Sequence, residues 1–196
     1  MSGPALRKLV GAEITAAIPD LARLRIDVFR DFPYLYDGDE AYELGYLEHY
    51  AHSAQAVLIA AYDGDWLVGA STAAPLMDHD AAFADALSRA GIDTASTFYC
   101  GESVLLPRYR GQGIGHTFFD MREAHARAQG YRQICFCAVL RPHDHPLRPK
   151  GYRPLDPFWS RRGYARVPGA VARLAWKDLD QAVETEKPLQ VWLRAL

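Results

Sequence analysis

The chain has 196 residues, of which 49% are hydrophobic and 23% charged. This composition is typical of a folded globular domain and excludes disordered, collagen-like and disulfide-rich chains. With a formal net charge of −2, we expect no basic surface for duplex nucleic acid. No apolar run approaches the ~20 residues of a membrane span, and the first residues lack the apolar stretch of a signal peptide. The three cysteines cannot all pair, so we expect reduced thiols and a cytoplasmic location.

The hydrophobic pattern predicts one mixed α/β domain over residues 1–196, without linkers or repeats. In the first half we expect a strand at 5–10, a helix from Leu21 to Phe29 after Pro19, a loop at 32–39, a helix at 40–51, and a hairpin of strands 56–62 and 66–73. In the second half we expect a helix at 78–90, a strand at 97–106, a turn at 108–115, a helix at 116–129, a strand at 134–140, a loop at 141–157, a helical turn at 158–162, and closing strands at 166–176 and 188–196.

The most informative segment is the glycine-rich turn, which reads Pro-Arg-Tyr-Arg-Gly-Gln-Gly-Ile-Gly-His from Pro107 to His116. It joins a buried strand to a helix, and the unpaired N–H groups of a helix N-terminus bind anions, phosphate above all. A phosphate-binding loop of the P-loop type requires a Lys after the glycines, which is absent here. A dinucleotide-binding turn requires the spacing G-x-G-x-x-G, which this segment does not have.

The spacing instead fits R-x-x-G-x-G, with Arg110, Gly113 and Gly115. This stretch resembles the acetyl-CoA pyrophosphate loop of the GNAT superfamily of N-acetyltransferases. The segment Phe158-Trp159-Ser160-Arg161-Arg162-Gly163-Tyr164 is similar to a later element of that family, F-Y-x-x-x-G-F. The resemblance implies the GNAT fold, a mixed and mostly antiparallel sheet of about seven strands flanked by helices, with acetyl-CoA as cosubstrate.

By this resemblance, the backbone of Leu105 pairs with the pantetheine arm, and the amides from Gln112 to His116 hold the pyrophosphate. The thioester lies in a gap between the strands that end at Leu106 and near Leu140. The cofactor-binding residues that the resemblance implies are Leu105, Arg110, Gly111, Gln112, Gly113, Ile114, Gly115 and His116.

Glu102 is the candidate general base, because it lies within an otherwise apolar strand just before the CoA-binding stretch. Burial of a carboxylate there would raise its pKa toward neutrality. Strand alternation places Glu102 on one face with Cys100 and Val104, unless a bulge changes the parity. The alternative interpretations are a Glu on an exposed stretch and a structural ion pair with an arginine.

The general acid is less defined. The Tyr that protonates the thiolate in the family falls on Trp159, whose indole N–H is a donor but not a useful acid. Tyr152 and Tyr164 are the alternatives, as is direct expulsion of the thiolate. The family's frequent Asn after the following strand is also absent, since Leu140 is followed by Arg141.

The acceptor side is marked by acidic and aromatic residues and by a proline-rich loop. Tyr34 and Tyr36 are predicted to contact the acceptor, whose cationic amine would suit aromatic rings and nearby acids; alternatively they only pack the helices. Arg141 and His143 begin the loop at 141–157, which we expect to form an ordered wall of the acceptor site, with Trp159 packed beneath it. His143-Asp144-His145 lacks an evident third ligand, so no metal is expected.

These observations predict an acetyl-CoA-dependent N-acetyltransferase that acts on a small-molecule amine, without nucleic-acid or membrane partners and with a homodimer as an open possibility. An acyl-CoA-binding sensor without turnover is the alternative. A nucleotide-binding protein of the glycine-turn type is disfavoured by the missing Lys and the spacing.

Overall fold

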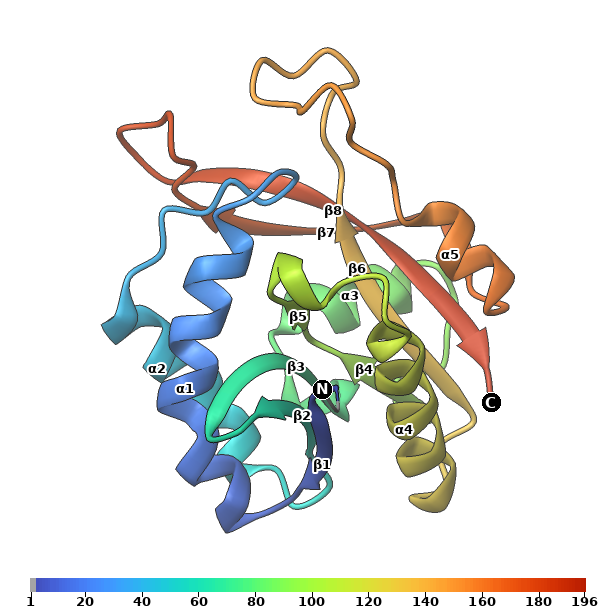
Figure 1. Cartoon of the computed structure of the whole chain (residues 1–196). Coiled ribbons are helices and arrows are strands. Elements are labelled where there is room, and N and C mark those ends of the chain that lie inside the picture. Colours follow the sequence, from blue (N-terminus) through green and yellow to red (C-terminus); the bar gives the residue numbers. More distant parts are fainter. Residues whose placement is uncertain (1–2) are drawn as a thin grey trace.

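An eight-stranded sheet forms the centre of the protein in the computed structural model, which describes residues 3–196 (Figure 1). The strands are β1 (Ala5–Leu9), β2 (Val57–Asp63), β3 (Trp66–Pro75), β4 (Thr97–Cys100), β5 (Ser103–Leu105), β6 (Gln133–Val139), β7 (Ala165–Trp176) and β8 (Thr185–Ala195). Their order is β1-β2-β3-β4-β6-β8-β7, with β5 also paired to β3. Among the strand pairs of the described residues, only β4–β6 is parallel. The eighth strand arises because the segment predicted as one strand, 97–106, divides into β4 and β5.

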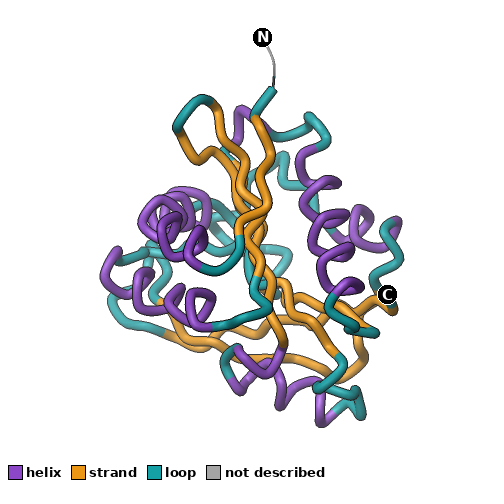
Figure 2. Tube along the Cα trace, turned by 90° about the horizontal axis from the view of Figure 1, so that it is seen from below, coloured by secondary structure: helices purple, strands orange, loops and turns teal. Residues whose placement is uncertain are grey.

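Helices cover both faces of this sheet (Figure 2). They are α1 (Ala12–Phe29), α2 (Glu40–His52), α3 (Ala81–Arg89), α4 (Ile114–Ala128) and α5 (Asp156–Arg161), with short 3-10 turns η1 (Leu76–Asp78) and η2 (Pro107–Tyr109). α1, α2 and α3 pack on one face, and α4 and α5 pack on the other. No helix in the described part of the chain is long and apolar enough to cross a membrane.

The first helix is longer than the sequence predicts. It begins at Ala12 and includes Pro19. A proline in a helix removes one backbone hydrogen bond, but Ile14, Leu21 and Leu24 form a buried face of α1 on both sides of it. Burial of this apolar face outweighs the local loss, since tertiary packing supplies most of a helix's stability.

The helix predicted at 78–90 forms as α3, but it begins only at Ala81, because Asp78 still belongs to η1. Asp80 caps α3, since its side chain accepts a hydrogen bond from the N–H of Ala82. Cys100, Cys135 and Cys137 are free and buried in the core.

Candidate active site

The glycine-rich turn leaves the N-terminus of α4 free to bind an anion. Gly113 is the N-cap, and the φ angles of Gly111 and Gly113, 76° and 85°, lie in the left-handed region, which costs other residues roughly 1–2 kcal/mol. From Gly111 to Gly115, no backbone N–H donates a hydrogen bond to a described residue. These donors at the positive end of the helix dipole fit a pyrophosphate. The N–H of His116 is already used, since it bonds the Gly113 carbonyl at 2.9 Å.

Side chains of the turn hold it in shape. The Arg110 guanidinium donates from Nε to the Leu105 carbonyl at 3.0 Å. The backbone of Leu105 was predicted to pair with the pantetheine arm, and in this structure its carbonyl accepts a hydrogen bond from Arg110. Gln112 donates to the carbonyl of Arg108 at 3.1 Å. These contacts stabilise the turn from within, while its backbone N–H groups stay available.

The remaining residues of the predicted cofactor set lie at the start of α4. Ile114 is buried in the core, and the His116 ring packs edge-on against Phe158 of α5 at 4.9 Å between centroids. Gly115 has no heavy atom within 4 Å of an added Cβ and no positive φ. The fold therefore does not require glycine at this position, whereas close approach of a ligand would.

A gap opens in the sheet beside this turn. β4 pairs with β6 along Thr97–Cys100, and the chain then moves away so that β5 pairs with β3. In the described structure Cys137–Val139 of β6 pair only with β8. The gap lies where the resemblance places the thioester.

A bulge at Gly101–Glu102 separates β4 from β5. The N–H of Gly101 donates to the Thr72 carbonyl at 3.2 Å, and the N–H of Thr72 donates to the Glu102 carbonyl at 3.1 Å. Gly101 and Glu102 therefore both lie opposite the single residue Thr72 of β3, which is the pattern of a β-bulge. The side chain of Glu102 therefore lies on the α1 face with Val104, whereas Cys100 packs with the α4 cluster. The predicted shared face with Val104 is confirmed, and the one with Cys100 is wrong because the bulge shifts the alternation.

The bulge is fixed from both faces. A Cβ on Gly101 would lie 1.8 Å from the hydroxyl of buried Tyr50, and that hydroxyl accepts a hydrogen bond from Thr72 at 2.8 Å. From the other face, Arg122 of α4 donates to the Glu102 carbonyl at 3.1 Å. These contacts determine where the Glu102 side chain begins.

The carboxylate of Glu102 forms an ion pair with Arg25 of α1, at 2.6 Å between Oε2 and Nη1. The same guanidinium binds Oε2 of Glu43 of α2 through Nε. All three residues are buried, and the Oε1 atoms of Glu43 and Glu102 have no hydrogen-bond partner. Glu102 thus combines the structural ion pair of the alternative interpretation with a second oxygen that is unoccupied.

Tyrosines surround these two carboxylates. Burial raises the pKa of Tyr34 to about 12, and burial together with the charge of Glu43 raises the pKa of Tyr36 further. Burial and the charge of Glu102 raise the pKa of Tyr46 and that of Tyr50. All four phenols are therefore protonated at neutral pH and able to donate hydrogen bonds. Of the predicted acceptor residues, Tyr34 lies near the predicted base Glu102, and Tyr36 lies near Glu43.

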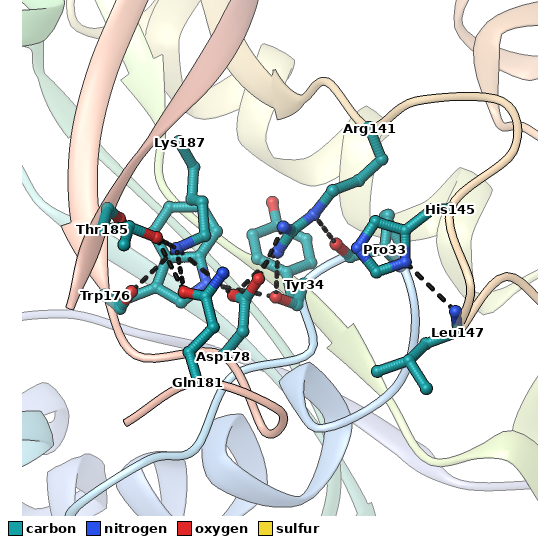
Figure 3. A network of polar contacts seen from close by, with 10 residues as sticks. All are labelled: Pro33, Tyr34, Arg141, His145, Leu147, Trp176, Asp178, Gln181, Thr185 and Lys187. Carbon is teal, nitrogen blue, oxygen red and sulfur yellow. Dashed lines mark hydrogen bonds and ion pairs between the residues drawn. The ribbon is translucent and has the colours of Figure 1, made fainter. Parts of the chain in front are cut away.

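Arg141 is bound within the protein (Figure 3). It forms two hydrogen bonds with the Asp178 carboxylate, at 2.7 and 2.9 Å, and donates to the carbonyls of Pro33 and Tyr34 at 2.8 and 2.7 Å. Lys187 approaches Asp178 from the other side, at 3.5 Å. Arg141 therefore fixes the loop between α1 and α2 to the β7–β8 end of the sheet.

The loop at 141–157 packs against the same α1–α2 loop. The Phe32 ring contacts the rings of His145 and Tyr152, with centroids 5.8 and 4.7 Å apart. His143 is exposed. Among the described residues, no group of three or more His, Cys, Asp or Glu side chains is placed to hold a metal ion.

Two residues considered for the general acid, Trp159 at the family's Tyr position and the candidate Tyr164, are occupied by structural contacts, while the candidate Tyr152 packs its ring against Phe32. Trp159 packs against Phe136 and Trp192, at 5.0 and 5.2 Å between centroids. Tyr164 is buried and its hydroxyl donates to Glu123 at 3.1 Å. Burial raises the pKa of Tyr164 far above its usual value, so it is a poor proton donor.

A histidine pair that was not predicted from the sequence lies beside the tyrosines. His49 Nδ1 lies 2.6 Å from the Tyr46 carbonyl, which can only accept, and His49 Nε2 lies 3.1 Å from His79 Nδ1. If both rings are neutral, His79 must donate from Nδ1, and its Nε2 is an acceptor, buried without a partner. Burial and the neighbouring His49 lower the pKa of His79 well below 6.5. The two residues are 30 positions apart, so no local pattern pairs them.

Comparison with known proteins agrees with this geometry. Residues 21–149 match the acetyltransferase (GNAT) family. This chain belongs to that family. No curated protein matches its sequence.

Solved structures similar to this GNAT protein share its fold at low sequence identity. An N-acetyltransferase from Staphylococcus aureus Mu50 has a TM-score of 0.61 and 10% identity, with 99% of each chain covered. YncA, an acetyltransferase from Salmonella typhimurium solved with acetyl-CoA, has a TM-score of 0.61 and 10% identity over 100% of this chain and 95% of that one. The PaiA N-acetyltransferase from Thermoplasma acidophilum, in complex with coenzyme A, has a TM-score of 0.54 and 13% identity over both whole chains.

Proposed function

We propose that this protein transfers the acetyl group of acetyl-CoA to a primary amine of a small molecule. The observation that carries the proposal is the row of unpartnered N–H groups from Gly111 to Gly115 at the N-terminus of α4, next to the gap between β5 and β6. Such donors suit the pyrophosphate of acetyl-CoA, and the gap suits its thioester arm. The three buried, unpaired cysteines support a cytoplasmic location.

In the proposed reaction Glu102 is the general base. The free Oε1 accepts a proton from the acceptor's ammonium, and the resulting amine nitrogen attacks the thioester carbonyl. An N–C bond forms, the C–S bond breaks, coenzyme A leaves as the thiolate, and the second proton of the attacking nitrogen passes to water. Arg25 holds the other oxygen of Glu102, which fixes the carboxylate's orientation. Positioning of two bound reactants supplies much of the acceleration.

Binding at the turn is tested with Gly115→Leu. Its side chain would occupy the space that the ligand needs, so the acetyl-CoA affinity measured by calorimetry should fall by about 100-fold, equivalent to about 2.7 kcal/mol. Gly45→Leu on α2 is the matched control, because Gly45 is also helical and also has no neighbours within 4 Å of an added Cβ. Equal affinities in the two variants would disprove the proposed site.

Catalysis is tested with Glu102→Gln in an assay that follows free thiol over a panel of primary amines. Turnover should fall by about 10²–10⁴-fold while acetyl-CoA affinity stays within twofold. The second candidate, an acyl-CoA sensor, is favoured by the loss of two acids, since Trp159 replaces the family's Tyr and is packed in the core, and the Tyr164 hydroxyl is bound to Glu123. Tight acetyl-CoA binding without thiol release from any amine would support the sensor.

A further inference from the structure

The acid cluster beside the strand gap has an incomplete charge balance. We define it as Arg25, Glu43 and Glu102: one guanidinium bound to two carboxylates. Arg122 reaches only the backbone carbonyls of Thr72 and Glu102. Among the described side chains, Arg25 is thus the one cation within 4 Å of these two carboxylates.

Each carboxylate also lacks a hydrogen-bond partner at one oxygen. Oε1 of Glu43 and Oε1 of Glu102 are buried and unpartnered, and the two residues are 0% and 3% exposed. A buried polar atom without a partner costs roughly 1–3 kcal/mol, and more when it carries charge. A ligand with one positive charge would balance the charge of the cluster, and its N–H donor would give the free oxygen of Glu102 a partner.

The surroundings favour a cation over other ligands. The Arg25 guanidinium already lies over the rings of Phe29 and Tyr46, 4.9 and 4.6 Å from their centroids. Tyr34, Tyr36 and Tyr46 beside the cluster are only partly buried, so their aromatic rings are the part of the surroundings that is open to solvent. Aromatic faces attract alkylammonium ions, whereas a carboxylate on the ligand would meet two like charges.

We infer that the acceptor binds as an alkylammonium ion without a neighbouring carboxylate, and that Glu43 is the residue that selects for its charge. The ammonium donates an N–H to Glu102 Oε1. Arg25 balances one of the two carboxylate charges, and the positive charge of the ammonium balances the second, which Glu43 supplies. Glu43 is a specificity residue, while Glu102 alone takes the proton. This inference rests on the proposed function, because it concerns the same acceptor site.

The test measures binding of a cation that cannot be stably acetylated. The probes are tertiary dimethylammonium ions with ethyl, butyl and phenethyl substituents, each with one N–H, and 2-phenylethanol as a neutral donor. Calorimetry with the acetyl-CoA complex should show binding of at least one ammonium probe and at least 10-fold weaker binding of the alcohol. The Glu43→Gln variant should bind the cation at least 10-fold more weakly than the wild type.

Two further variants separate charge from structure. Glu43→Asp keeps the charge and should bind the probe within about threefold of the wild type. Glu48→Gln is the matched control on α2, because Glu48 is exposed and pairs only with His52; it should change affinity less than twofold. A Glu43→Gln variant with unchanged acetyl-CoA affinity shows that the CoA half of the site is intact.

The outcomes distinguish this inference from the proposed function. If primary amines are acetylated but no ammonium probe binds, or Glu43→Gln leaves probe affinity unchanged, the inference is overturned and the proposed function stands. If a probe binds as expected but no amine releases thiol, the inferred ammonium site is supported and the proposed acetyl transfer is refuted. Faster acetylation of phenylalanine than of phenethylamine would also overturn the inference.

Discussion

The contact between Gly101 and Tyr50 gives a sharp test of how the bulge is held. A Cβ at position 101 would lie 1.8 Å from the Tyr50 hydroxyl and 3.0 Å from Thr72 Oγ1. The φ of Gly101 is not positive, so the backbone itself accepts alanine. Tyr50 is 1% exposed, so its ring has little room to withdraw. Gly101→Ala therefore tests packing, with little contribution from backbone strain.

The expected cost follows from these contacts. Overpacking of a buried site costs about 1–3 kcal/mol, and displacement of the Tyr50 hydroxyl loses the bond from Thr72, worth about 1 kcal/mol. Alanine also lowers the conformational entropy of the unfolded chain, which stabilises the folded state by about 0.4–1 kcal/mol. Gly101→Ala should thus lower the free energy of unfolding by about 2–3 kcal/mol. Tyr50→Phe should cost about 1 kcal/mol, since it removes only the hydrogen bond.

The double variant provides the decisive measurement. Without the hydroxyl, the nearest remaining Tyr50 atom to a Cβ at position 101 is Cζ at 3.2 Å, so Tyr50→Phe should make room for Gly101→Ala. Urea unfolding at 25 °C with linear extrapolation should show that the double variant is about 1–2 kcal/mol more stable than additivity predicts. Gly45→Ala is the control, since an exposed helical Gly→Ala change should stabilise by about 0.5–1 kcal/mol. Additivity within about 0.5 kcal/mol would refute the steric argument.

Two further predictions concern groups outside the bulge. Asp178→Asn should destabilise the protein by about 3 kcal/mol, because it leaves buried Arg141 and Lys187 without their anion; it should also raise the acceptor's KM more than that of acetyl-CoA, since Arg141 holds the Tyr34 carbonyl. Unchanged unfolding would contradict this. His79 has a lowered pKa in the folded protein, so its contribution to stability is present above the unfolded pKa of ~6.5 and is lost as pH falls. Between pH 7.5 and 5.5, urea unfolding of the wild type should lose about 1.4 kcal/mol more than that of His79→Gln, and equal losses would contradict the assignment.

Features set by local sequence were predicted well. The hairpin around Gly64 forms as expected, and Gly64 has a φ of 60°. The turn before α4 needs glycine at Gly111 and Gly113 for the same backbone reason. Such features depend on the conformational preferences of neighbouring residues, so one sequence is sufficient to find them.

Features set by contacts between distant segments were not predicted. The bulge depends on Tyr50 and Thr72, which lie far from Gly101 in sequence. The helix α1 continues through Pro19 because its apolar face is buried against the sheet. Arg25 follows Leu21 by one helical turn, so a charge on the buried face was visible in the sequence. Its partners Glu43 and Glu102 were not, because nothing local joins the three segments.

Two buried ion clusters among the described residues, one around Asp178 and one around Arg25, differ in how completely their carboxylates are bound. Both oxygens of Asp178 accept hydrogen bonds from Arg141, as expected of a contact that fixes backbone segments. Glu43 and Glu102 each have one oxygen bound and one unpartnered. A buried ion pair contributes little net stability even when fully bound, because apolar residues of similar shape are often as stable. The unpartnered oxygens add a cost that packing does not explain, and they lie beside the strand gap, where a substrate cation would offset it.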